Sequence, residues 1–173
     1  MVPVRALQMI FWLAFLLAGC NGVATKEQAF LRKFSQEDFN EFKNTSFFWR
    51  GRDEDSMMLV LAEPRLDSTC SPITFISVDV KTRRINRVRR TFELPCKSGL
   101  SKPQIERLAT KVIGYSVRSV NVDDRGNVTI GFQPSNFTSD DLVKVVDKRS
   151  FSSSFWKEYA PVRDSWYVRK VDN

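Results

Sequence analysis

The sequence contains no histidine and only three cysteines. The missing histidine excludes Ser-His-Asp and Cys-His catalysis, His-Glu-x-x-His zinc sites, and the usual general acid or base near neutral pH. After residue 20, no apolar run reaches the roughly 20 residues that a membrane-spanning helix needs. No catalytic or cofactor motif stands out among the remaining residues. We therefore predict no cofactor and no metal site, and we do not expect an enzyme.

The composition is that of one globular domain. The chain has 173 residues, of which 42% are hydrophobic and 27% charged, and its 14 phenylalanines and four tryptophans supply large core side chains. A chain of this length predicts a single domain. The formal net charge is +7. A basic balance is compatible with nucleic acid, anionic lipid or acidic glycan as a partner, but it does not select among them.

The first twenty residues have the pattern of an export signal. Arg5 supplies a positive charge and is followed by the apolar run Met9 to Ala18 (MIFWLAFLLA), which has signal-peptide length. The run ends in Leu17-Ala18-Gly19-Cys20. This string resembles the lipobox of bacterial lipoprotein precursors, in which two small residues precede a cysteine. The resemblance covers residues 1–21 only and implies nothing about the fold that follows.

The resemblance implies where the protein works. Residues 1–19 would be cleaved, Cys20 would carry diacylglycerol and an amino-terminal acyl chain such as palmitate, and residues 20–28 would form a lipidated tether. The protein would then be anchored to a membrane of the cell envelope. Asn21, where an aspartate would retain some lipoproteins in the inner membrane, favours the outer membrane.

Two other N-terminal readings stay open. An ordinary secretory signal would be cut nearby, for example after Ala24, and would leave no lipid. The triplets that begin at Asn44, Asn127 and Asn136 match the N-glycosylation pattern and fit a secreted glycoprotein without an anchor.

The rest of the chain predicts one α+β domain over residues 29–173: an antiparallel sheet of about five to seven strands with one main amphipathic helix packed on it. That helix is expected at 102–114, because Ser101 and Gln104 form a capping box before an apolar stripe. The other predicted strands are 47–49, 57–62, 117–122, 128–132 and 166–171. The other predicted helices are 29–34, a second one from Ser35, and 140–147.

A hairpin of strands 73–80 and 85–94 is the most regular pattern in the chain. If paired residue numbers sum to 166, apolar residues share one face, and Asp79 opposes Arg87 on the other. The same register places Cys70 opposite Cys96. A disulfide there would stabilise the fold by roughly 3 kcal/mol on the loop-entropy estimate. The alternative, a metal or redox pair, lacks both histidine ligands and C-x-x-C spacing.

The strip Lys81 to Arg90 (KTRRINRVRR) gathers six cations on this hairpin. Arg83, Arg84, Arg87 and Arg89 are the candidate residues for binding an anionic glycolipid, another anionic surface component or an envelope protein. The alternative is a solvated strand face. An envelope location argues against nucleic acid as the partner. In the predicted register Arg90 falls on the apolar face, where its guanidinium needs a partner.

The remaining polar and aromatic patterns are weaker. Asp53-Glu54-Asp55 is better explained as a solvated turn than as a binding site for a hard cation. Asp123-Asp124 is typical of a turn. The aromatic residues at 47–49, 155–156 and 166–167 would line either a ligand surface or the core. The first functional hypothesis is therefore a non-enzymatic, membrane-anchored binding protein. The alternatives are a small carboxylate-dependent envelope hydrolase and a secreted glycoprotein.

Overall fold

A computed structural model describes residues 25–52, 55–63, 72–91, 99–132 and 142–170. Cys20, Cys70 and Cys96 lie outside these ranges, as do Asn136 and the acidic pair at 53–54. The lipidation and the disulfide therefore stay predictions, and the cation alternative to a solvated turn at 53–55 stays open. Among the described residues, no helix is both long and apolar enough to cross a membrane.

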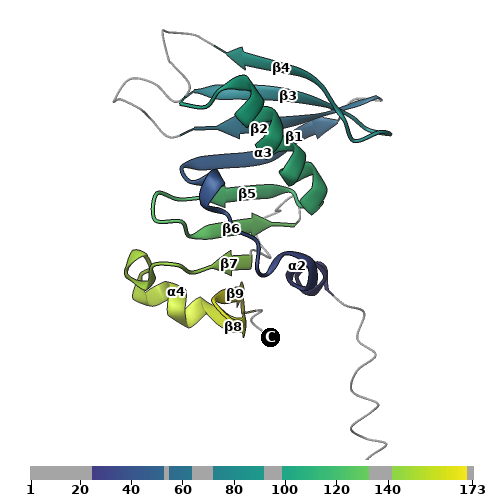
Figure 1. Ribbon diagram of the computed structural model, residues 1–173. Helices are drawn as coiled ribbons and strands as arrows, with labels where there is room; N and C mark the ends of the chain where they lie inside the picture. The colour runs from purple at the N-terminus through teal and green to yellow at the C-terminus, as the bar shows by residue number, and fades with distance from the viewer. Residues whose placement is uncertain (1–24, 53–54, 64–71, 92–98, 133–141, 171–173) are drawn as a thin grey trace, which may run out of the picture.

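The protein is an α+β fold built on one antiparallel sheet of nine strands, ordered β4-β3-β2-β1-β5-β6-β7-β9-β8 (Figure 1). The strand count exceeds the five to seven expected from the sequence. The strands are β1 (Thr45–Arg52), β2 (Ser56–Ala62), β3 (Ile73–Asp79), β4 (Ile85–Thr91), β5 (Ser119–Val122), β6 (Val128–Gly131), β7 (Leu142–Lys144), β8 (Tyr159–Arg163) and β9 (Trp166–Arg169).

The main helix, α3 (Lys102–Tyr115), confirms the sequence prediction. Ser101 caps it with Gln104 in a reciprocal capping box, and the C-cap is Ser116, whose backbone is left-handed with φ 55°. α3 lies across strands β1 to β4 (Figure 1). The helix and the sheet bury their apolar side chains against each other to form the core, which includes Ile105, Leu108, Val112, Phe47, Leu59, Leu61, Ile76 and Val78.

The N-terminal helix, α2 (Lys26–Phe34), begins three residues earlier than predicted, because Thr25 accepts a hydrogen bond from the Gln28 N–H and caps it. Ser35 is the C-cap of this helix and not the start of another. The expected second helix is only a 3-10 turn, η1 (Asn40–Phe42). Phe39 and Phe42 are nevertheless buried in the core.

The segment after residue 140 differs most from the prediction. Leu142–Lys144 is a strand, although a helix was expected over 140–147, and a 3-10 turn, η2 (Lys148–Ser150), follows it. Phe155 and Trp156 lie in a short helix, α4 (Ser153–Glu158), and β8 was not predicted at all. β7 is a strand because it hydrogen-bonds to β6 on one side and to β9 on the other.

The β3–β4 hairpin has the predicted faces but not the predicted register. Residue pairs from Ile73↔Thr91 to Ser77↔Arg87 sum to 164, so Arg87 opposes Ser77 and not Asp79. The reason is the turn. Asp79 is its first residue: its carboxylate accepts the N–H groups of Lys81 and Thr82 at 3.0 and 2.6 Å. A shift of two residues preserves the faces. The Cys70–Cys96 prediction now rests on an even pair of cysteines and no longer on register.

Candidate functional site

A groove lies on the sheet face opposite α3. Its lining residues come from three adjacent strands: Met58 from β2, Phe75 and Ser77 from β3, and Arg87 and Arg89 from β4. It encloses about 510 Å³. Along β3 the buried residues alternate with these half-buried ones, as expected when one face carries the core and the other faces outward. We call this feature the arginine groove.

The strand register sets an apolar floor beside a cationic wall. Ser77 lies between Met58 on β2 and Arg87 on β4. Phe75 lies between Val60 and Arg89 in the same two strands. The arginines therefore follow one side of a strip formed by Met58, Val60 and Phe75.

Arg50 adds a third cation that the sequence analysis missed. The strand predicted at 47–49 stopped short of it, but Arg50 belongs to β1 at a bulge between Trp49 and Gly51. Its guanidinium carbon lies 5.9 Å from the centroid of the Phe75 ring. A cation at this distance over an aromatic face is electrostatically favourable. Only the alignment of β1, β2 and β3 brings Arg50 near Phe75, and no local sequence signal encodes that alignment.

The four arginines that the sequence predicted as one binding strip do not lie together in the structure. Arg87 and Arg89 line the groove, whereas Arg83 reaches the other side of the sheet and donates a 3.1 Å hydrogen bond to the Ile113 carbonyl at the end of α3. Its guanidinium carbon also lies 6.0 Å from the Trp49 ring centroid. Arg84 is exposed in the turn and does not line the groove. Two of the four candidate residues thus share a site.

Arg90 has the partner that its position required. It is half-buried on the helix-covered face, and its guanidinium donates a 2.6 Å hydrogen bond to the Leu100 carbonyl just before α3. Arg90 therefore ties the edge strand β4 to the start of the main helix and leaves Arg87 and Arg89 as the groove-facing cations of this strand.

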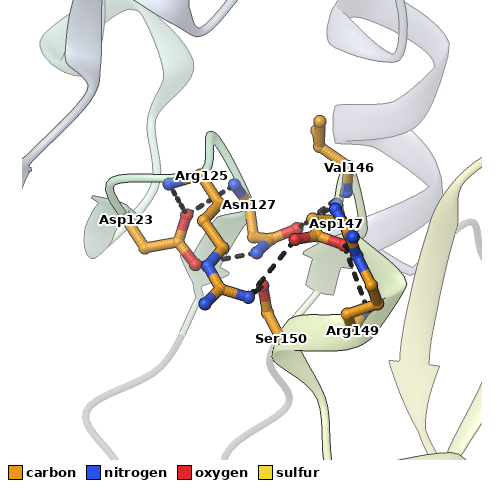
Figure 2. Close-up of polar contacts among 7 residues, drawn as sticks. All are labelled: Asp123, Arg125, Asn127, Val146, Asp147, Arg149 and Ser150. Carbon is orange, nitrogen blue, oxygen red and sulfur yellow. Dashed lines mark hydrogen bonds and ion pairs between the residues drawn. The ribbon is translucent and has the colours of Figure 1, made fainter.

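A second polar constellation joins the β5–β6 turn to the loop after β7 (Figure 2). The Asn127 Oδ1 accepts the N–H groups of Val146 and Asp147 at 2.8 and 2.9 Å, and its Nδ2 donates to Asp123 at 2.8 Å. Hydrogen bonds from the N–H and side chain of Arg149 lower the pKa of Asp147. These contacts connect two loops. We call them the Asn127 lock.

The Asn127 lock bears on glycosylation. Asn127 is only 5% exposed, and the nitrogen to which a glycan would be attached is already hydrogen-bonded to Asp123. A sugar at this position would require the lock to open. Asn44, in contrast, is exposed, with a left-handed backbone of φ 60°.

The most prominent carboxylate pair forms an ion-pair network. Lys111 on α3 bridges Glu37 and Glu41, and the Tyr115 hydroxyl donates to Glu37 at 3.2 Å. The hydrogen bond to Glu41 raises the pKa of Lys111, and burial raises that of Tyr115. Arg107 also pairs with Glu41, at 3.3 Å, so two cations balance the two carboxylates. Among the residues described, no group of three histidine, cysteine, aspartate or glutamate side chains is placed to hold a metal ion.

The aromatic candidates divide between core and surface. Phe47 and Trp166 are fully buried, and the Trp166 indole donates to the Ser35 carbonyl at 3.1 Å. Phe48 is 37% exposed on the face of the arginine groove, opposite Val60. Phe155 and Trp156 pack against Tyr167.

Comparison of the chain with protein-family models, curated proteins and solved structures finds no match. The functional argument therefore rests on the sequence and on the geometry of the arginine groove.

Proposed function

We propose that the protein is a non-enzymatic lipoprotein of the cell envelope that binds an anionic amphiphile, such as a phosphorylated glycolipid, in the arginine groove. The observation that carries this proposal is the juxtaposition of three arginines with an apolar floor. Arg87 and Arg89 line the groove beside Met58 and Phe75, and Arg50 lies over the Phe75 ring. A ligand that uses both features has a charged group attached to an apolar part.

The guanidinium group favours phosphate among anions. Its planar fork of donors matches the oxygens of a phosphate in a bidentate geometry, and it is less strongly hydrated than an ammonium group. Both lining arginines are exposed, so their guanidinium groups stay hydrated until a ligand binds. The Phe75 ring and the Met58 side chain then offer apolar surface that a purely ionic ligand leaves unused.

The location in this proposal comes from the lipobox-like string. Cleavage before Cys20 and lipidation of its thiol would hold the domain at a membrane, with the outer membrane favoured by Asn21. A tether confines the groove to a thin layer and raises its effective concentration towards membrane components. Cys70 and Cys96 would form a disulfide in this oxidising compartment.

The alternatives receive less support. A hydrolase of the predicted type needs carboxylates at the site, and none of the described residues that line the arginine groove is acidic. For a secreted glycoprotein, a glycan on Asn127 would open the Asn127 lock, which leaves the exposed Asn44 as the acceptor among the described residues. An acidic protein partner would use the same arginines but would not require the apolar floor.

A binding measurement with matched probes tests the proposal. The lipidated protein in neutral detergent is titrated with a phosphorylated glycolipid and with the same glycolipid without phosphate. We expect Arg87→Glu with Arg89→Glu to weaken binding of the phosphorylated probe more than tenfold. The control pair, Lys148→Glu with Lys157→Glu, changes the charge equally at exposed positions outside the groove and should leave the affinity within twofold.

Either of two results would overturn the glycolipid proposal. One is equal affinity for the two probes. The phosphate would then contribute nothing to binding, and the arginines would not be its binding site. The other comes from a photo-cross-linker placed at Ser77 in intact cells: capture of a protein and no glycolipid would favour the protein alternative.

A further inference from the structure

A second basic groove lies at the other end of the sheet, between α2 and the last two strands. It encloses about 650 Å³ and is lined by Thr25, Glu27, Gln28, Leu31, Arg32, Val162, Arg163, Val168 and Arg169. Three of these side chains are cationic and one is acidic. The groove is thus an apolar cleft with a cationic rim. Its helix, α2, includes residues 26–28, the last three of the predicted tether.

The outer face of α2 is cationic. Its exposed residues are Lys26, Gln28, Ala29, Arg32 and Lys33, and its one carboxylate, Glu27, is half-buried. Beside the helix, β8 presents Val162, which is 49% exposed, and Arg163. Two nearby carboxylates pair with cations of this end: Asp164 with Arg163 at 3.8 Å, and Glu158 with Arg169 at 3.1 Å. Among the described residues, cations therefore outnumber carboxylates on this surface.

Distance along the chain places this surface near the predicted anchor. Five residues separate Cys20 from Lys26, so even a fully extended tether would span only about 20 Å. In the opposite direction, the sheet order puts eight inter-strand spacings between β8 and β4. At about 4.8 Å per spacing, the two edges of the sheet are roughly 38 Å apart.

We infer that the surface formed by Lys26, Arg32, Lys33, Val162 and Arg163 lies against the anionic phospholipid headgroups of the membrane that holds the anchor. The β2–β4 end of the sheet, which carries the arginine groove, then lies far from that membrane, because β4 and β8 are the two edges of the sheet (Figure 1). This inference rests on the proposed lipidation of Cys20. The charge of the surface complements anionic headgroups, the exposed Val162 side chain suits the membrane interface, and the short tether leaves α2 little distance from the bilayer.

Photo-cross-linking from the lipid side tests this orientation with the native lipidated protein. The protein is reconstituted into phosphatidylethanolamine–phosphatidylglycerol vesicles that contain a photoactivatable phosphatidylglycerol, and cross-linked peptides are mapped by mass spectrometry. We expect cross-links within 26–33 and 159–163 and few within 84–90. Each cation near an anionic surface strengthens the contact about fivefold. Arg32→Glu with Arg163→Glu should therefore reduce the α2 and β8 cross-links at least fivefold, and Arg87→Glu with Arg89→Glu should not.

The outcomes separate this inference from the function on which it rests. Intact mass measurement of the mature N-terminus reports lipidation of Cys20 independently of orientation, so its failure would contradict the anchor itself. Groove binding in detergent reports the proposed ligand. If Cys20 is lipidated but cross-links concentrate at 84–90 or spread evenly over both ends, the membrane-facing surface proposed here is wrong.

Discussion

Asn127 satisfies two backbone donors and one carboxylate with a single buried side chain. The Val146 and Asp147 N–H groups have Asn127 Oδ1 as their acceptor, and its Nδ2 donates to Asp123 (Figure 2). The sequence could predict the turn around Gly126, whose φ is 86°, because glycine adopts this conformation without strain. It could not predict the long-range half of the lock, since residue 127 meets residues 146 and 147 only when β6 and β7 pair.

The Asn127 lock predicts a stability loss from one substitution. Asn127→Ala would leave two backbone N–H groups without their acceptor, and each such loss costs about 1–3 kcal/mol. We expect the free energy of unfolding to fall by about 2–4 kcal/mol in chemical denaturation. Asn121→Ala on β5 is the matched control, because Asn121 is exposed, and it should change stability by about 0.5 kcal/mol or less. Equal effects of the two substitutions would show that the lock contributes nothing.

At the scale of elements, local signals were predictable and pairing was not. α3 could be placed from Ser101, Gln104 and an apolar stripe, because capping and periodicity act within one helix. β7 has three residues and β8 contains Pro161, so neither carries a strand signature of its own. They become strands because their backbone groups hydrogen-bond to β9, which lies between them.

The residues of the candidate site also include some that the sequence could predict and some that it could not. The basic character of β4 and the faces of its hairpin followed from alternation, so Arg87 and Arg89 could be predicted as neighbours on one face. Arg50 and Phe75 could not, because their contact depends on the β1 bulge and on the registers of two strand pairs. Arg83 was assigned to the same strip, but its position in a turn with φ 58° directs its side chain to α3.

This division of the arginine strip gives a prediction for Arg83. Arg83→Ala removes a cation that bonds the Ile113 carbonyl at the C-terminal end of α3, an interaction worth about 0.5–1 kcal/mol at an exposed site. We expect that loss in thermal or chemical denaturation and less than a twofold change in affinity for the phosphorylated glycolipid. Arg84→Ala, at the adjacent exposed position, should change neither quantity. A tenfold loss of affinity in Arg83→Ala would return this residue to the ligand site.

At the scale of the whole molecule, the nine-stranded sheet separates two cationic surfaces. One is the arginine groove at the β2–β4 end, and the other is formed by α2 and β8. The edges of the sheet lie roughly 38 Å apart at about 4.8 Å per strand spacing. The Debye length at physiological ionic strength is about 8 Å. Exposed charges at one end therefore have almost no electrostatic influence at the other.

The two surfaces should accordingly behave as independent sites. In neutral detergent at 0.15 M salt (about the physiological value), we expect Arg32→Glu with Arg163→Glu to change the Kd for the phosphorylated glycolipid less than twofold. We expect Arg87→Glu with Arg89→Glu to raise that Kd more than tenfold. The four-site variant should match the groove variant within about twofold, because free-energy effects of distant sites add. A Kd in the four-site variant well above that of the groove variant would mean that the ligand contacts both surfaces. The sheet would then bind it across its whole width instead of holding one edge at the membrane and presenting the groove beyond it.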